Sequence, residues 1–243
     1  LCERRFGIGA DGILLLLPAG HPSADYRMRI LNADGSEAEM CGNGIRAFAH
    51  YIYLKKLTSK KPLLIETLAG LIQVEKKAKL YRVAIGKPEF SPEKVPVKSP
   101  KPVIKKKIKI EGKEYEITCL SVGNPHCVIL VEDVDQIPLS QIGPKIEHHP
   151  WFPKRTNVEF VQVLAKNRLK VRVWERGAGE TLACGTGASA SLVCAHQLGL
   201  IDSQAEVLLP GGALKIELID GTVYLTGPAE LVYSGEFEPA KFK

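Results

Sequence analysis

Two short stretches of the sequence place a cysteine where chemistry could occur. Met40-Cys41-Gly42-Asn43-Gly44 and Ala183-Cys184-Gly185-Thr186-Gly187 both read Cys-Gly-polar-Gly, and each opens a segment rich in alanine and apolar residues that is typical of a helix. A glutamate, Glu37 or Glu180, stands four residues before each cysteine. A motif that occurs twice, each time with a thiol at an expected helix start, predicts two half-sites that face one substrate from opposite sides.

The start of a helix suits the binding of an anion. It presents unpaired backbone N–H groups and about half a positive charge, so it attracts a carboxylate. Glycines beside each cysteine let the backbone approach a ligand closely. The thiol is expected to shift toward thiolate, because a cysteine pKa of about 8.5 can fall to about 3.5–7.5 at such a position. A thiolate that takes a proton while the opposite thiol gives one would perform two-base chemistry at a tetrahedral carbon.

Other interpretations of a cysteine at a helix start stay open at this level. A single Cys-Gly-x-Gly motif is more often a structural cap with a buried thiol, and only the duplication with matching glutamates favours a catalytic role. One reactive cysteine alone would indicate a nucleophile or a redox centre. A thiol–disulfide oxidoreductase is disfavoured because the sequence contains no Cys-x-x-Cys pair.

Composition and charge argue against several classes of partner. The 243 residues, 45% of them hydrophobic, suffice for one large domain or two small ones. The longest apolar run, residues 13–17, is too short to cross a bilayer, and no signal peptide is recognisable. Much of the net charge of +6 lies in residues 94–113, where no aromatic residue interleaves with the lysines to stack on bases. We expect a solvated linker and an edge hairpin there, and neither a membrane nor a nucleic acid as partner.

The remaining cysteines suggest no disulfide or metal framework. Cys119, Cys127 and Cys194 lie in apolar runs and are expected to be small core residues. His126-Cys127 alone does not make a zinc site, so no metal is expected. A chain of this size needs no disulfide scaffold, which favours a reducing, cytoplasmic compartment. Motif-like sequence begins almost directly after Leu1, so we expect an N-terminal segment to precede it.

The hydrophobic pattern predicts many strands and two strong helices. The helices are expected at residues 44–57 and from Cys184 to about Leu198. Strands are expected at residues 13–17 (buried), 26–31, 63–67, 71–75, 80–85, 127–131, 156–163, 170–175, 206–209, 214–219 and 222–226. A loop with prolines and two histidines is expected before residue 156. The order of elements repeats, which indicates an α+β protein of two similar domains, each a curved sheet packed on one helix.

At these residues the sequence resembles the diaminopimelate epimerase family of cofactor-independent amino-acid epimerases. The matching blocks follow in order along nearly the whole chain: Arg5–Gly12, Asn32–Arg46, Gly123–Cys127, Asn157–Phe160 and Glu175–Ala188. The resemblance implies two pseudo-symmetric domains, residues 1–85 with 230–243 and residues 86–229. Each would be a β-barrel-like sheet around a central helix, with the active site in the cleft between them. The last strand of the chain would return to the first domain.

Carried over by position, the resemblance implies roles for individual residues. Cys41 and Cys184 would be the acid/base pair that interconverts LL- and meso-diaminopimelate in lysine and peptidoglycan precursor biosynthesis, with no cofactor. The reacting carboxylate would be held by backbone N–H groups of Gly42, Asn43, Gly185 and Thr186. The distal amino-acid end would be read by Asn32, Asn157 and Arg176, with Arg176 forking onto its carboxylate. Glu175 would lie near the ammonium groups, and the site would be lined by Asn124 and His126.

The resemblance is incomplete at two places and leaves alternatives. The family's N-terminal strand, with its Gly-Asn-x-Phe-type motif, is absent from this sequence, and Gly12 stands where many members carry glutamine. The closest alternative is a related racemase or epimerase of another amino acid, such as a proline derivative. Arg176 with the asparagines favours a small substrate with a second polar amino-acid end. Both cysteines argue against a non-catalytic binding protein, and a homodimer is the candidate assembly.

Overall fold

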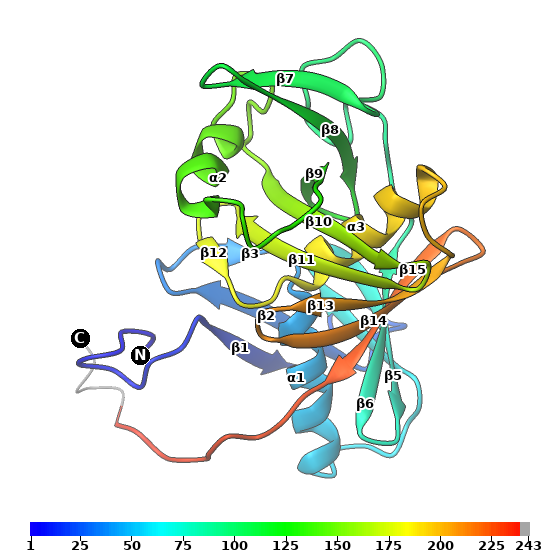
Figure 1. Ribbon diagram of the computed structural model, residues 1–243. Helices are drawn as coiled ribbons and strands as arrows, with labels where there is room; N and C mark the ends of the chain where they lie inside the picture. The colour runs from blue at the N-terminus through cyan, green and yellow to red at the C-terminus, as the bar shows by residue number, and fades with distance from the viewer. Residues whose placement is uncertain (239–243) are drawn as a thin grey trace. The chain divides into compact units, whose positions relative to one another are not determined.

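The computed structural model describes residues 1–238 and shows an α+β protein, as the sequence predicted (Figure 1). This part of the chain contains three helices and fifteen strands. The chain divides into two compact units, one formed by Leu1–Val83 with the segment from Gly227 onward, the other by Ala84–Thr226. Each unit contains one of the two cysteine motifs.

The first unit is a mixed sheet that packs against one helix. In order across the sheet, its strands are β1 (Gly12–Leu17), β2 (Tyr26–Asn32), β4 (Leu63–Thr67), β5 (Gly70–Lys77) and β6 (Leu80–Gly86). The β2–β4 pair is parallel and the other neighbours are antiparallel, while the short β3 (Glu37–Ala38) pairs with β2. On β2, Met28 and Ile30 are buried, which confirms the predicted alternation. The expected full burial of β1 is wrong, because all its residues are only partly buried on this edge strand.

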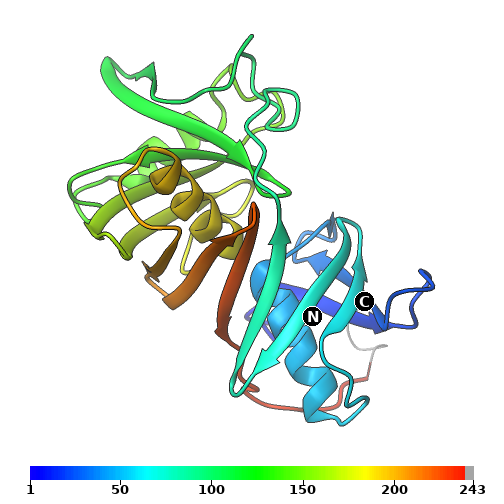
Figure 2. The ribbon, with the colours of Figure 1, turned by 90° about the vertical axis from the view of Figure 1, so that its right-hand side faces the viewer.

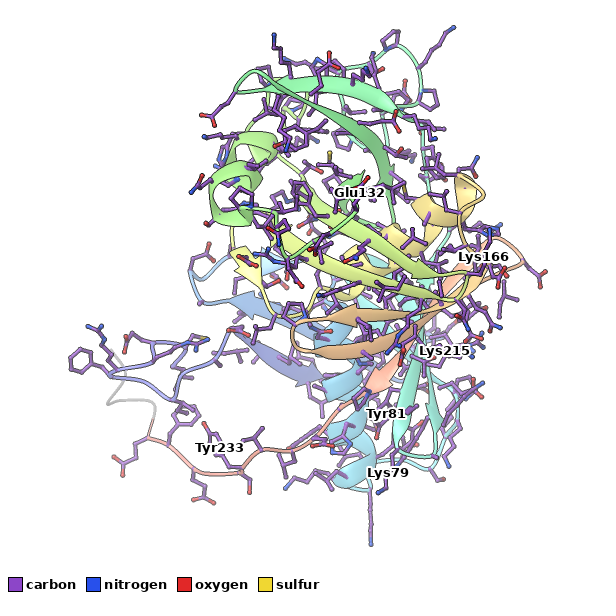
Figure 3. The ribbon with its side chains drawn as sticks, in the orientation of Figure 1. Lys79, Tyr81, Glu132, Lys166, Lys215 and Tyr233 are labelled. Carbon is purple, nitrogen blue, oxygen red and sulfur yellow. The ribbon has the colours of Figure 1, made fainter. Side chains whose placement is uncertain are left out.

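Helix α1 (Gly42–Leu54) lies against this sheet (Figure 2). Its apolar residues at helical spacing, Ile45, Phe48, Ala49 and Ile52, are buried and face β1, β2 and β5. The helix ends three residues earlier than expected, since Lys56 has a positive φ of 54° and Leu57 is exposed. Tyr81 of β6, labelled in Figure 3, is 1% exposed, and its hydroxyl lies 3.0 Å from His50 Nδ1 on α1.

The second unit is a larger sheet that curves around its helix. Across the sheet its strands are β15 (Thr222–Pro228), β14 (Gly212–Ile219), β13 (Gln204–Leu209), β11 (Arg168–Glu175), β10 (Asn157–Ala165), β9 (Pro125–Leu130), β8 (Lys113–Ser121) and β7 (Lys106–Ile110). The pairs β9–β10 and β11–β13 are parallel, and β12 (Gly179–Thr181) pairs with β11. Helix α3 (Gly185–Gln197) contacts six of these strands (Figure 2). This is the barrel-like sheet around a central helix that the family resemblance implied.

Helix α3 is buried on every side from Gly185 to Ala195. The sheet can enclose it because its residues are small and its polar groups are paired. Ser189 and Ser191 donate their hydroxyls to the carbonyls of Gly185 and Gly187 at 2.9 and 2.7 Å. The hydrogen bond compensates for the removal of each hydroxyl from water, so its burial does not destabilise the helix as an unsatisfied polar group would.

Helix α2 (Leu139–Glu147) was not predicted, because this segment was expected to be part of a loop. Pro144 lies inside the helix, where proline removes a hydrogen bond and opposes helix formation. Tertiary packing offsets this cost. Leu139 and Ile146 join the core, and Gly143 lies so close to the Trp174 ring that an added Cβ would come within 2.6 Å of it.

The lysine-rich stretch is only partly the solvated linker that was expected. Its lysines are mostly exposed, and β7 forms an edge hairpin with β8, as predicted. Val95, Val97 and Val103, however, are buried in the core cluster that includes Phe160. Lysine and valine therefore divide the stretch into an outer and an inner face.

No strand follows β15 in the described residues, although a last strand that returns to the first domain was expected. Residues 229–238 form neither helix nor strand. The segment carries the exposed Leu231, Val232 and Tyr233, of which Tyr233 is labelled in Figure 3. The regular sheet thus stops at Pro228. Residues 239–243 of the expected first domain lie outside the described residues. Between residues 1 and 238, no helix is both long and apolar enough to cross a membrane.

Candidate active site

The two motif cysteines occupy equivalent positions at the starts of α1 and α3. Cys41 is the N-cap of α1 with φ −139° and ψ 117°, and Cys184 is the N-cap of α3 with φ −118° and ψ 113°. Each Sγ accepts a hydrogen bond from the backbone N–H three residues on, at Gly44 or Gly187, at 3.3 Å in both cases. The sequence repeat is therefore a repeat of local geometry. A thiol takes the place of the hydroxyl or carboxylate that usually caps a helix.

The two duplicated glutamates have a structural role. Glu37 accepts from Arg29 Nε and Nη2 at 2.8 and 2.9 Å, and Glu180 accepts from Arg172 Nε and Nη2 at 3.0 and 2.7 Å. Each pair joins the long strand to the short strand that leads into a cysteine helix, β2 to β3 and β11 to β12. The hydrogen bonds from Arg29 hold the pKa of Glu37 below its usual value. These glutamates therefore brace the strand pair that precedes each cysteine helix.

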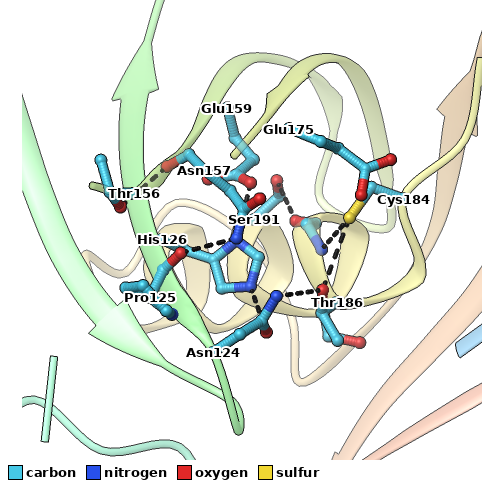
Figure 4. A network of polar contacts seen from close by, with 12 residues as sticks. Asn124, Pro125, His126, Thr156, Asn157, Glu159, Glu175, Cys184, Thr186 and Ser191 are labelled. Atoms are coloured by element: carbon cyan, nitrogen blue, oxygen red, sulfur yellow. Dashed lines mark hydrogen bonds and ion pairs between the residues drawn. The ribbon is translucent and has the colours of Figure 1, made fainter. Parts of the chain in front are cut away.

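Inside the second unit, Cys184 lies at the end of a line of polar contacts (Figure 4). Its Sγ is 3.4 Å from Thr186 Oγ1, which accepts from Asn124 Nδ2 at 3.2 Å. Asn124 Oδ1 is 2.9 Å from His126 Nε2, and His126 Nδ1 is 2.7 Å from Glu159 Oε1. His126 is 0% exposed, and its two ring nitrogens contact Asn124 and Glu159.

The environment of Cys184 favours the thiol over the thiolate. Burial raises the pKa of this thiol well above its usual value, and the carboxyl groups of Glu175 and Glu159 raise it further. Hydrogen bonds from Thr186 and from the Gly187 N–H act in the opposite direction and are outweighed. The expected shift toward thiolate is therefore wrong for Cys184. We therefore expect Cys184 to carry its proton at neutral pH.

The start of α1 has the opposite electrostatic character. Arg46, 7% exposed, donates to the Gly42 carbonyl at 3.0 Å, to Asn43 Oδ1 at 3.1 Å and to the Pro228 carbonyl at 3.1 Å. Burial lowers the pKa of Arg46, while its interaction with Cys41 raises it. A buried guanidinium thus stands near Cys41, whereas two carboxyl groups act on Cys184. Sequence reasoning gave Arg46 no role, although it lies in a matching block.

These differences predict an order of alkylation. At neutral pH, iodoacetamide is expected to modify Cys41 first, because Cys41 is partly exposed and lies near a cation, whereas Cys184 is 5% exposed and protonated. Raising the pH through the elevated pKa of Cys184 should increase its modification. Cys119, Cys127 and Cys194 should stay unmodified, since they are the buried core residues that were predicted and the pKa of Cys194 is raised to about 12. Peptide mass spectrometry over time measures the order, and equal rates at Cys41 and Cys184 would contradict it.

The turn that carries Arg176 is held by two side chains. Asn157 Oδ1 accepts from the Arg176 N–H at 2.9 Å, and Asn157 Nδ2 donates to the Pro125 carbonyl at 2.8 Å. Glu147, at the end of α2, accepts from the Gly177 N–H at 3.0 Å and from Trp174 Nε1 at 2.7 Å. Asn157 therefore positions the turn through its backbone contacts. The Arg176 guanidinium is exposed, with one contact of 3.5 Å to the Lys154 carbonyl.

Replacing Glu147 by alanine is expected to destabilise the protein by about 1–3 kcal/mol, since it removes two part-buried hydrogen bonds from Trp174 and Gly177 to a buried carboxylate. Glu147 is 3% exposed and also lies 3.8 Å from Arg155. Urea unfolding measures the change in the free energy of unfolding. Glu93→Ala is the matched control at an exposed position and should change it little. A Glu147→Ala protein as stable as the control would show that the carboxylate does not hold the turn.

Glu175 and Asn32, two further predicted site residues, and Gly12, the departure from the family pattern, each have a defined local contact. Glu175, the last residue of β11, accepts from Thr181 Oγ1 at 2.5 Å and acts electrostatically on Cys184. Asn32 donates its side-chain amide to Ser36 Oγ at 2.9 Å and so closes the turn after β2. A Cβ on Gly12 would lie 2.7 Å from the Leu31 carbonyl oxygen, so the backbone there suits glycine.

Four further predicted residues, Gly42, Asn43, Gly185 and Thr186, occupy the first two positions of α1 and α3, where a helix presents N–H groups to an anion. Asn32, Cys41, Gly42 and Asn43 belong to the first unit, and the other site residues belong to the second. Among residues 1–238 there is no group of three or more His, Cys, Asp or Glu side chains that could hold a metal ion.

Sequence reasoning missed several residues that position this site. Glu147 was hidden in a segment expected to be a loop. Glu159 interrupts the apolar run Val158–Val161, and a charged residue at such a place is a signal of a buried, paired group. Arg29 and Arg172 each stand eight residues before the repeated glutamate, so the repeat could have been extended to them.

Comparison with known proteins places the chain among epimerases. A family model described as diaminopimelate epimerase matches residues 1–91 and 118–232. The chain is 51% identical to the diaminopimelate epimerase of Halothermothrix orenii, over 97% of this chain and 86% of that protein. It is 50% identical to that of Acetivibrio thermocellus, with the same coverage. A solved hydroxyproline epimerase from Agrobacterium vitis superposes with a TM-score of 0.69 at 18% identity, covering 90% of this chain and 73% of that one, which shows the fold alone.

Proposed function

Because the chain belongs to the diaminopimelate epimerase family, we propose that it interconverts LL- and meso-diaminopimelate by proton transfer at one α-carbon. The observation that carries the proposal is the repeated thiol cap. Two helices in two units begin with a cysteine whose Sγ accepts the same backbone hydrogen bond. In the reaction, one thiolate takes the α-proton and the other thiol gives a proton to the opposite face of the carbon. The proposal requires both thiols to reach one α-carbon.

The energetic difficulty is the weak acidity of the α-proton. Each unit by which the pKa of the α-proton exceeds the pKa of the thiol costs about 1.4 kcal/mol. The helix starts supply part of the compensation, since the N–H groups at Gly42, Asn43, Gly185 and Thr186 would bind the carboxylate on which negative charge develops. Exclusion of water from the bound state strengthens each of these interactions. We therefore expect the substrate to be enclosed before the proton moves.

The charges around each thiol support different resting roles. Cys184 would begin as the acid, because its surroundings hold its proton. Cys41, which lies close to the cationic Arg46, would be its partner in the proton transfer. A substrate ammonium group that pairs with Glu175 would remove part of the repulsion that opposes a thiolate at Cys184. Substrate binding would thus ease the reverse step, in which Cys184 must accept the proton.

Four further expectations accompany this function. The substrate is a small molecule, and neither nucleic acid nor membrane takes part in the reaction. The enzyme would act in the cytoplasm, in lysine and peptidoglycan precursor biosynthesis, where reduced thiols persist. Oxidants should inactivate it reversibly, with activity restored by a reductant. A homodimer is the assembly that we propose, and light scattering of the purified protein tests it.

The test of the function is product analysis with two substrates. Reduced protein is incubated with LL-diaminopimelate and, separately, with trans-4-hydroxy-L-proline, and the stereoisomers are separated by chiral chromatography. We expect meso-diaminopimelate to form and hydroxyproline to stay unchanged. The chain is 18% identical in sequence to the hydroxyproline epimerase, whereas it is 51% and 50% identical to the two diaminopimelate epimerases. Turnover of hydroxyproline alone would favour the alternative substrate class.

A further inference from the structure

The first unit contains a buried cation that is paired with no carboxylate of the described residues. Arg46 is 7% exposed, and its guanidinium donates from Nη1 to the Gly42 carbonyl, from Nη2 to Asn43 Oδ1 and from Nε to the Pro228 carbonyl. The direction of each bond is fixed, because a guanidinium has donors and no acceptor. All three acceptors are neutral oxygens.

A buried charge without a counter-charge is unfavourable. Charged groups inside proteins are normally paired, because their removal from water is costly. Neutral oxygens satisfy the hydrogen bonds of the Arg46 guanidinium, but they do not supply an opposite charge. Burial accordingly lowers the pKa of Arg46, and the group whose interaction raises this pKa is Cys41. The position therefore suits a state in which a negative charge lies at the start of α1.

The equivalent position of the second unit shows that the local fold does not need this cation. Arg46 and Ser189 each stand five residues after a motif cysteine. Each donates to the carbonyl of the first helical residue, Gly42 at 3.0 Å or Gly185 at 2.9 Å. The repeat of local geometry thus extends beyond the thiol cap. Since a serine satisfies this carbonyl in the second unit, the contact does not explain a buried cation in the first.

The guanidinium is fixed at the first turn of α1. Two of its partners, Gly42 and Asn43, are the first two residues of the helix, where a helix presents N–H groups to an anion. The third partner, Pro228, comes from the end of β15 and fixes the same group by its carbonyl. Arg46 therefore adds a full positive charge to the partial charge of the helix start.

We propose that Arg46 is a positioning residue of the first half-site, whose charge draws the substrate carboxylate to the N–H groups at the start of α1. The inference rests on the proposed function in that the reaction places a carboxylate there. The hydrogen bonds of Arg46 go to the protein, so it acts on the substrate through its charge. The charged groups that act on Cys184 are carboxyl groups, so the two half-sites differ in sign.

The test compares two alkylating reagents at Cys41 in the full, reduced chain, by site-resolved mass spectrometry. Iodoacetamide is neutral, whereas iodoacetate carries a carboxylate on the carbon that the sulfur attacks, as an amino acid does on its α-carbon. Both reagents react with the thiolate, so the ratio of their rate constants does not depend on the fraction of thiolate. The ratio of iodoacetate to iodoacetamide therefore measures how well the start of α1 accepts a carboxylate.

Removal of the charge should lower this ratio. Arg46→Met and Arg46→Gln are each expected to lower it about tenfold at low salt, the effect of one unit charge at close range in a partly solvated site. The glutamine keeps an amide donor and replaces Arg46→Met in the measurement if that variant does not fold. Arg46→Lys keeps the charge without the planar fork, and its ratio should lie within about threefold of the wild type. A purely structural role of Arg46 would change both rate constants and leave their ratio unaltered.

Two controls use the same reagents. Lys79→Met removes the same charge from an exposed position on the turn between β5 and β6, labelled in Figure 3, and should leave the ratio at Cys41 unchanged. Wild-type protein unfolded in urea should show a lower ratio at Cys41 than the folded protein, a comparison that needs no variant.

Four results would overturn the proposal. They are an unchanged ratio in Arg46→Gln, a ratio in Arg46→Lys as low as in Arg46→Gln, an equal fall in Lys79→Met, and a wild-type ratio no higher in the folded than in the unfolded chain. Because neither reagent is the substrate, the result is separate from whether the protein epimerises diaminopimelate.

Discussion

Cys41→Ser and Cys184→Ser are each expected to lower the turnover of LL-diaminopimelate by about 10²–10⁴-fold, the usual contribution of a general acid or base. A serine hydroxyl is far less acidic than a thiol, so it neither forms the base nor gives up a proton readily at neutral pH. The fold should survive, because both positions are helix N-caps with an extended backbone, where serine is a preferred residue. The loss would therefore reflect chemistry.

The control for these variants is Cys2→Ser. Cys2 is a free, partly exposed cysteine that takes no part in the hydrogen bonds around either thiol cap. Its replacement should leave turnover near the wild-type rate. Retention of more than about a tenth of the activity in either Cys41→Ser or Cys184→Ser would contradict an essential acid–base role for that residue.

Arg176→Met is expected to lower kcat/KM for diaminopimelate by about 10²–10³-fold, mainly by raising KM. A forked guanidinium–carboxylate contact contains two charge-assisted hydrogen bonds, each worth about 1.5–3 kcal/mol and only partly additive. Thermal stability should change little, because the guanidinium is exposed and makes one long contact to Lys154. The turn itself is held through backbone groups by Asn157 and Glu147.

Arg176→Lys separates charge from geometry at the same position. Lysine keeps the positive charge but cannot fork onto a carboxylate, so its kcat/KM should lie between those of the wild type and Arg176→Met. Steady-state kinetics with LL-diaminopimelate measure all three proteins. A value for Arg176→Met within about threefold of the wild type, a difference below about 1 kcal/mol, would mean that another group reads the distal end.

Much of the fold could be predicted because the local pattern of apolar residues indicates the helices and strands. The period of apolar residues in α1 and the alternation in β2 are set by which face each element buries. Helix α2 could not be predicted, since Pro144 opposes it and its stability comes from packing against Trp174, which is distant in the sequence. Local propensity fails where tertiary contacts decide the outcome.

The site divides in the same way. The thiol caps follow from a motif of adjacent residues, and the duplication made them recognisable. The protonation of Cys184 does not follow from that motif, because it depends on Glu175 and Glu159 from two other strands and on burial. A helix start alone predicts a thiolate, and the enclosing sheet reverses that prediction. Electrostatic properties of a site therefore need the fold, even when its reactive residues do not.

The two-thiol mechanism is tested most directly by proton NMR of LL-diaminopimelate with reduced protein in heavy water. The wild type should remove the α-proton signal of the substrate and form the meso isomer with deuterium at the inverted carbon. Cys41→Ser and Cys184→Ser should each form no meso product on the same timescale. Formation of meso product at the wild-type rate by either variant, or no exchange with reduced wild-type protein, would contradict the account.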